Sequence, residues 1–143
     1  MRMHEVEIKM NSVLQSEALC RVLVSAFLLP YGISEEDLLE VKTIVSEGVC
    51  NAIFHGCDSV EDHFILSLRL EGNELSITIQ DFGKGIEDLE LARTPLYTTK
   101  AEEERSGLGF TIMETFSDEL WVENRKGHGV ILHLRKVLTF HGE

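Results

Sequence analysis

Hydrophobic and polar residues alternate along several stretches of the chain and recur at helical spacing along others. Alternation indicates strands, because successive side chains of a strand point to opposite faces of a sheet. It predicts strands at residues 4–11, 64–70, 75–79, 119–124 and 130–137. Only a short polar turn separates the second of these from the third, so the two are expected to form an antiparallel hairpin with one buried face.

Three longer segments carry apolar residues at helical spacing. The first, 12–29, ends near Pro30, which cannot continue a helix. Ser34 is the predicted N-cap of the second helix, because three acidic residues follow it, and Gly56 is placed to end that helix. The third spans 107–116. Strands and helices in this order indicate an α/β sandwich.

The segment 94–106 differs from the rest of the chain, because it is polar, has weak periodicity and contains three consecutive glutamates. A loop of this length in a compact domain is typical of a mobile lid over a ligand. A short helical stretch is expected at 87–92, just before it. The length of 143 residues fits one domain, with no internal repeat.

Charge and cysteine usage narrow the classes of partner and compartment. Thirteen Lys and Arg against 25 Asp and Glu give a formal net charge of −12, so we expect no nucleic-acid partner. Cys20, Cys50 and Cys57 lack C-x-x-C spacing, which favours reduced core thiols in a cytoplasmic protein. No apolar run is long enough to predict a membrane span.

Two polar residues of the second helix are candidates for chemistry. Glu47 and Asn51 stand at positions i and i+4, so they project within about 40° of each other and can share one ligand. An Asn oxygen suits Mg²⁺, and a Glu can take a proton from a nucleophile. The alternative is a solvated polar pair on an amphipathic helix.

Glycine motifs strengthen the case for a nucleotide site. Asp81 ends a strand, where its carboxylate can accept a hydrogen bond from an amine such as that of adenine, and Gly83 and Gly85 leave room for a base or ribose. The Gly-Leu-Gly sequence at 107–109 begins a helix and offers N–H groups to phosphate. Arg105 can balance phosphoryl charge. A plain turn is the alternative for each glycine motif, and a solvated ion pair is the alternative for the arginine.

Four motifs occur in a fixed order: E-x-x-x-N-A-I-x-H-G at 47–56, D-x-G-x-G-I at 81–86, P-L-Y-T-T-K at 95–100 and E-R-S-G-L-G-F at 104–110. Together they resemble the ATPase superfamily shared by histidine kinases, gyrase, Hsp90 and the mismatch-repair ATPase. The last two resemble more narrowly the sporulation anti-sigma F factors, a family of serine protein kinases. The resemblance covers nearly the whole chain. It implies a histidine-kinase-like fold, a two-layer α/β sandwich whose mixed, largely antiparallel sheet is covered on one face by helices.

The resemblance also implies roles for single residues, with ATP and Mg²⁺ as cofactors. Glu47 would be the general base for an acceptor serine, Asn51 the Mg²⁺ ligand and Asp81 the adenine reader. Arg105 would stabilise charge on the transferring phosphoryl group. The other implied nucleotide contacts shape the pockets or belong to the ATP lid: Gly83, Gly85, Thr98, Thr99, Lys100, Ser106, Gly107, Leu108 and Gly109.

Protein partners follow from the same resemblance. Family members bind their sigma factor through the first helix, where Glu17 and Arg21 occupy the polar side and are the expected contacts. The implied protein is a homodimer that inhibits a sporulation sigma factor and phosphorylates a serine of the competing anti-anti-sigma protein. One departure is the turn 127–129, Gly-His-Gly, where relatives commonly have Gly-Thr, so a hydroxyl contact to the nucleotide is expected to be replaced.

Three alternatives stay open. A nucleotide-sensing binding module would hold its partner according to ATP or ADP occupancy and transfer no phosphate. An anti-sigma kinase of the general stress response would differ in its sigma partner and not in its chemistry. The catalytic domain of a histidine kinase ranks last, because it requires a helix with a phosphoacceptor histidine upstream of His4.

Overall fold

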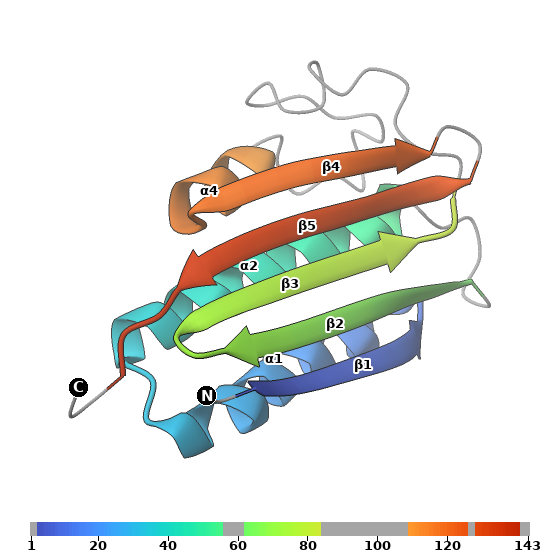
Figure 1. Cartoon of the computed structure of the whole chain (residues 1–143). Coiled ribbons are helices and arrows are strands. Elements are labelled where there is room, and N and C mark those ends of the chain that lie inside the picture. The colour runs from blue at the N-terminus through green and yellow to red at the C-terminus, as the bar shows by residue number, and fades with distance from the viewer. Residues whose placement is uncertain (1–2, 56–61, 84–108, 126–127, 141–143) are drawn as a thin grey trace.

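Five strands form one antiparallel sheet in the order β1-β2-β3-β5-β4 (Figure 1). The computed structural model describes residues 3–55, 62–83, 109–125 and 128–140. The strands are β1 (Met3–Asn11), β2 (His63–Glu71), β3 (Glu74–Asp81), β4 (Glu119–Arg125) and β5 (Gly129–Val137). Because β5 lies between β3 and β4, the start of β5 is placed directly beside the end of β3.

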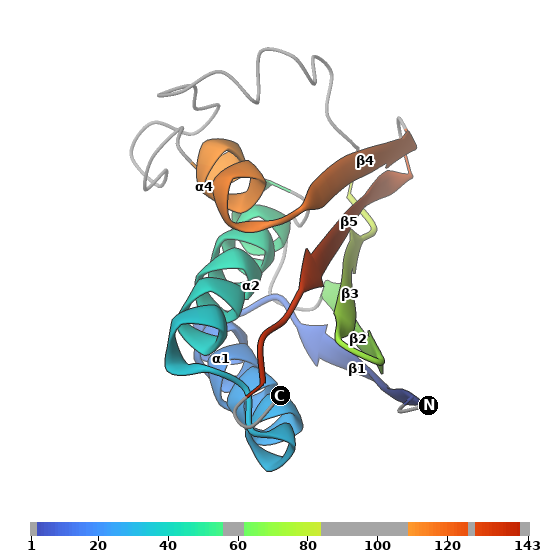
Figure 2. The ribbon, with the colours of Figure 1, turned by 60° about the vertical axis from the view of Figure 1, so that its left-hand side comes forward.

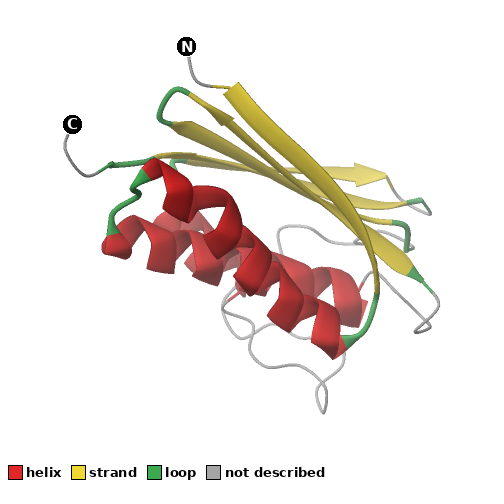
Figure 3. Cartoon of the chain, turned by 90° about the horizontal axis from the view of Figure 1, so that it is seen from below, coloured by secondary structure: helices red, strands yellow, loops and turns green. Residues whose placement is uncertain are grey.

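All described helices cover one face of this sheet (Figure 3). They are α1 (Leu14–Leu28), which continues into the 3-10 helix η1 (Leu29–Tyr31), α2 (Glu35–His55) and α4 (Gly109–Phe116). α2 runs along the sheet between α1 and α4 and contacts both (Figure 2). The predicted two-layer α/β sandwich with helices on one face is therefore confirmed, and every described strand pairing is antiparallel.

The core lies between the sheet and the helices. Alternate residues of the central strands point inward and are almost fully buried: Phe64, Leu66, Leu68, Leu70, Leu75, Ile77, Ile79, Leu132 and Leu134. Burial of each such side chain contributes about 1.5–3 kcal/mol, which makes this alternation the main determinant of the strand register. Cys20 and Cys50 are buried as expected, and burial raises the pKa of the Cys20 thiol to about 12. Cys57 lies outside the described residues.

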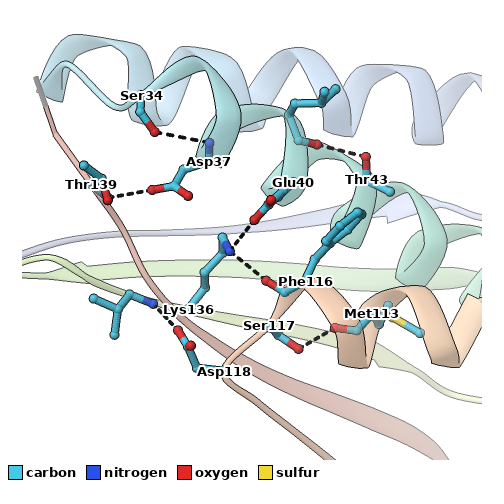
Figure 4. Close-up of polar contacts among 12 residues, drawn as sticks. Ser34, Asp37, Glu40, Thr43, Met113, Phe116, Ser117, Asp118, Lys136 and Thr139 are labelled. Atoms are coloured by element: carbon cyan, nitrogen blue, oxygen red, sulfur yellow. Dashed lines mark hydrogen bonds and ion pairs between the residues drawn. The ribbon is translucent and has the colours of Figure 1, made fainter.

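Predicted element boundaries that fall within the described residues agree closely with the structure, whereas Gly56, the predicted end of the second helix, lies outside them. Ser34 caps α2, since its Oγ accepts a hydrogen bond from the Asp37 backbone N–H at 3.2 Å (Figure 4). α1 begins at Leu14 and not at residue 12, because the Val13 backbone is extended, with φ of −127° and ψ of 154°. The Ser12 N–H before it donates to the Asp62 carbonyl at 2.8 Å. Pro30 is accommodated in η1, and Gly32, with φ of 75°, ends that turn in the left-handed region.

Several predicted segments lie outside the described residues. These are the short helix at 87–92, the lid at 94–106 and the beginning of the helix at 107–108. The single-domain organisation of residues 1–143 stays a prediction. Among the described helices, none is both long and apolar enough to cross a membrane.

Candidate nucleotide site

The candidate site lies where the second half of α2, the end of β3 and the beginning of α4 converge. Glu47 and Asn51 are one turn apart on α2, and both side chains are partly buried. Gly48, between them, brings α2 close to the sheet. A Cβ on Gly48 would lie 2.4 Å from Cδ1 of Ile79 on β3, so only a glycine permits this approach without movement of the isoleucine. The helix therefore carries both polar residues to the level at which β3 ends.

Asp81 is the last residue of β3 and is only 4% exposed. Its Oδ1 accepts hydrogen bonds from the backbone N–H of Gly83 at 3.1 Å and of Val130 at 3.2 Å. The two donors come from the loop after β3 and from the start of β5, so they fix the orientation of the carboxylate. A buried acid held in this way can accept a further hydrogen bond in a defined direction, as recognition of an amine requires.

Gly129 supports Asp81 and was not among the predicted site residues. Its φ is +106°, and a Cβ at this position would lie 2.2 Å from the Asp81 carbonyl oxygen. A side chain at Gly129 would push apart β5 and the end of β3, and would remove the Val130 N–H from Asp81. The sequence signal was the unusual turn at 127–129. The missing hydroxyl contact at that turn stays a prediction, and the structure adds that the Val130 N–H, directly after Gly129, donates to the Asp81 carboxylate.

α4 meets α2 at Glu47. A Cβ on Gly109, the first residue of α4, would lie 3.1 Å from Glu47 Oε2, so the predicted base and the predicted phosphate-binding glycine are neighbours. The N-terminal end of a helix carries unpaired N–H groups and partial positive charge, which favour an anion nearby. Glu47, Asn51, Asp81 and Gly109, drawn from separate parts of the sequence, thus belong to one end of the sandwich.

The described residues include Asn51, the side chain predicted as a magnesium ligand. They contain no cluster of three or more His, Cys, Asp or Glu side chains that could hold a metal. Mg²⁺ commonly takes one or two protein oxygens together with phosphate oxygens and waters. A single amide from Asn51 is consistent with that pattern.

The two predicted partner contacts lie on α1, away from this site. Arg21 Nε donates to Glu17 Oε2 at 2.6 Å, one helical turn apart. The surface of α1 and η1 includes several exposed apolar side chains. Its exposed large hydrophobic residues are Leu14, Leu19, Val22 and Leu29, with exposed fractions of 48–64%. The predicted polar contacts therefore border an apolar surface.

The remaining predicted site residues lie outside the described part of the chain: Gly85, Thr98, Thr99, Lys100, Arg105, Ser106, Gly107 and Leu108. Gly83 is described, and its backbone N–H bonds Asp81. The roles of the lid and of Arg105 stay predictions.

Comparison with known proteins gives a consistent family. The histidine kinase-like ATPase domain family matches residues 11–136. Anti-sigma F factors from Anoxybacillus flavithermus and Bacillus licheniformis are 43% and 44% identical to the chain, over 95% of its length and 94% of theirs. The anti-sigma F factor of Bacillus cereus is also 44% identical over the same shares.

Solved structures agree on the fold. The RsbU and RsbW domains of Rv1364c from Mycobacterium tuberculosis match with a TM-score of 0.71 at 16% identity, over 96% of this chain and 32% of that one. The catalytic domain of the histidine kinase ThkA matches with a TM-score of 0.59 at 19% identity, over 96% of both chains. These likenesses support the architecture and not the chemistry.

Proposed function

Since the chain belongs to the histidine kinase-like ATPase family and, within it, to the anti-sigma F factors, we propose that it is an ATP-dependent serine kinase that inhibits a sigma factor. The observation that carries the proposal is the convergence of Glu47, Asp81 and Gly109 at one end of the sandwich. That arrangement offers a proton acceptor, an oriented acid for a base and a helix start for phosphate within one site.

The chemistry divides among these residues. Asp81 accepts a hydrogen bond from the adenine amine, and the start of α4 donates N–H groups to the terminal phosphates. Asn51 would hold Mg²⁺, which would supply charge neutralisation at the phosphates. Glu47 takes the proton of the acceptor serine hydroxyl while the serine oxygen forms a bond to the γ-phosphorus. The bond from the γ-phosphorus to the bridging oxygen breaks, and ADP leaves with that electron pair.

Residues outside the described ranges complete the proposed site. Arg105 stabilises the charge on the transferring phosphoryl group, and Thr98, Thr99 and Lys100 belong to a lid that closes over ATP. The support is their motif order in the sequence. Gly85 and the three residues that precede α4 in the sequence, Ser106, Gly107 and Leu108, are proposed as further nucleotide contacts on the same support.

The protein partners are a sigma factor and the anti-anti-sigma protein that supplies the acceptor serine. The sigma factor partner is supported by the name of the relatives, which are anti-sigma F factors. The proposed contacts are Glu17 and Arg21 on α1, beside the exposed apolar side chains of that helix. The chain acts in the cytoplasm, in sporulation, as a homodimer.

The test is transfer of labelled γ-phosphate from ATP with Mg²⁺ to the cognate anti-anti-sigma protein. We expect label on a serine, and its loss in Glu47→Gln. The matched control is Glu36→Gln, an exposed glutamate in the first turn of the same helix, which should transfer at the normal rate. ATP binding without any transfer would contradict the kinase and favour the nucleotide-sensing module. Transfer to a stress-response antagonist alone would change the sigma partner and leave the chemistry intact.

A further inference from the structure

Lys136 of β5 joins three elements at the end of α4 remote from Gly109. Its Nζ donates to Glu40 Oε1 of α2 and to the backbone carbonyl of Phe116, each at 2.7 Å (Figure 4). The Lys136 side chain is 10% exposed and that of Glu40 is 23% exposed. A lysine this deeply buried requires both a countercharge and a hydrogen-bond acceptor, and α2 and α4 supply one each.

The accepting carbonyl belongs to the last residue of α4. Carbonyls at the C-terminal end of a helix have no partner within the helix and carry partial negative charge, so an ammonium there is favourable. The next residues are also attached to β5. The Asp118 N–H donates to the Arg135 carbonyl at 2.8 Å, and Asp118 Oδ2 accepts the Val137 N–H at 2.6 Å. The C-terminal end of α4 is therefore fixed to the sheet.

The opposite end of α4 is the part that meets the candidate base. Glu40 and Glu47 are seven residues apart on α2, about two helical turns, so they lie on the same side of that helix. α4 is tied to Glu40 through Lys136 at one end and contacts Glu47 through Gly109 at the other. An eight-residue helix is about 12 Å long and stiff, so a displacement at its end reaches its start.

We propose that Lys136 is a positioning residue: by fixing the end of α4 to α2 and β5, it sets where α4 begins relative to Glu47. The inference rests on the proposed function, because the start of α4 is the part assigned to the terminal phosphates. Adenine recognition is assigned to Asp81, which is bonded to the start of β5 through the Val130 N–H, whereas Lys136 lies near the end of that strand. The ammonium therefore affects transfer and the binding of the terminal phosphates, and leaves base recognition unchanged.

The experiment compares a double variant, Lys136→Met with Glu40→Leu, with the control Asp37→Asn. The double variant removes both buried charges together, so that neither remains unpaired. The control weakens a different attachment of α2 to the C-terminal segment, in which Asp37 Oδ2 accepts the Thr139 N–H at 2.6 Å, and leaves α4 untouched (Figure 4). Each protein is assayed for kcat and KM of phosphate transfer, for ATP and adenosine affinity, and for hydrogen exchange at residues 109–116.

We expect kcat of the double variant to fall by about 10-fold or more, since small misplacements of reacting groups have effects up to about 10²-fold. ATP affinity should fall relative to adenosine affinity, and exchange at 109–116 should become faster, while Asp37→Asn stays near the wild type. Equal losses for ATP and adenosine, or unchanged kcat and exchange, would overturn the inference. Wild-type protein that binds no nucleotide would instead overturn the proposed function, so the two failures are distinguishable. If the double variant does not fold, Lys136→Arg is measured instead, and the ratio of its ATP affinity to its adenosine affinity decides in the same way.

Discussion

The two ends of the contact between α2 and α4 are built in different ways. At the Glu40 end the helices are joined by polar bonds through Lys136, and the residues that follow α4 are bonded to β5. At the Glu47 end the elements approach through glycines, Gly48 against Ile79 and Gly109 against Glu47. Polar bonds through Lys136 thus mark one end of the contact, and close approach at glycines marks the other.

This difference shows how one helix supports two uses of the same residue type. Glu40 serves as the countercharge of a buried lysine, so the role of its carboxylate is structural. Glu47 instead faces the start of a helix, where a Cβ on Gly109 would lie 3.1 Å from Glu47 Oε2. A base needs access to a proton, whereas an anchor needs burial, and seven residues of helix separate the two environments.

The largest expected effect is on the rate of phosphate transfer. Glu47→Gln should lower it by about 10²–10⁴-fold, because an amide cannot take the serine proton. The melting temperature should change little, since the amide is isosteric with the carboxylate. Single-turnover transfer and thermal unfolding measure the two properties separately. A full transfer rate in Glu47→Gln would show that Glu47 is not the base. The proposed functional difference between Glu40 and Glu47 would then be wrong.

The next effect concerns nucleotide affinity. Asp81→Asn should weaken ADP binding by about 10- to 100-fold, because a hydrogen bond to a charged acceptor contributes about 1.5–3 kcal/mol. The asparagine oxygen can still accept the Gly83 and Val130 N–H groups, so the fold should persist. Isothermal titration gives the affinity, and the Ser67→Ala variant on the open face of the sheet serves as a control. Unchanged ADP affinity would exclude Asp81 as the base-reading group.

Substitution of Glu40, which pairs with Lys136, should lower stability, whereas substitution of Glu47 should lower the transfer rate and leave stability nearly unchanged. Glu40→Gln leaves the buried Lys136 ammonium without its countercharge, and we expect a loss of about 1–3 kcal/mol in the free energy of unfolding. Glu36→Gln, exposed on the same helix, should change it by less than about 0.5 kcal/mol. Urea denaturation measures both. Equal stability of the two variants would mean that the Lys136 contact is not an anchor.

The smallest effect tests the close approach at Gly48. Gly48→Ala gains about 1 kcal/mol in helix propensity but forces Ile79 Cδ1 to move, and Ile79→Val deletes that carbon. We expect the valine to cost about 0.5–1.5 kcal/mol in the wild type and less in the alanine background. A double-mutant cycle measured by urea denaturation gives the coupling. Additive changes would show that α2 does not need a glycine to reach β3.

Much of the fold could be predicted from periodicity. The alternation in β2 and β3 matches their buried faces, and the Ser34 cap is formed as predicted. The site was predicted less completely. Gly129 was missed because its need for a positive φ arises from β5 beginning beside Asp81, a proximity that no local pattern encodes. Lys136 was also missed, because a lysine in an alternating strand is expected to face solvent and its buried partners come from other elements.

The sequence by itself determined the elements, the faces they bury and the identity of the motifs, because these depend on spacing along the chain and on residue type. Tertiary structure alone decided which motifs meet. The antiparallel order that inserts β5 between β3 and β4 brings the Val130 N–H to Asp81, 49 residues away in the chain. Packing of α4 on α2 likewise sets Gly109 beside Glu47, and packing of α2 against the sheet sets Lys136 of β5 beside Glu40. Burial made those contacts specific, because a polar group removed from water must find its partner in the fold.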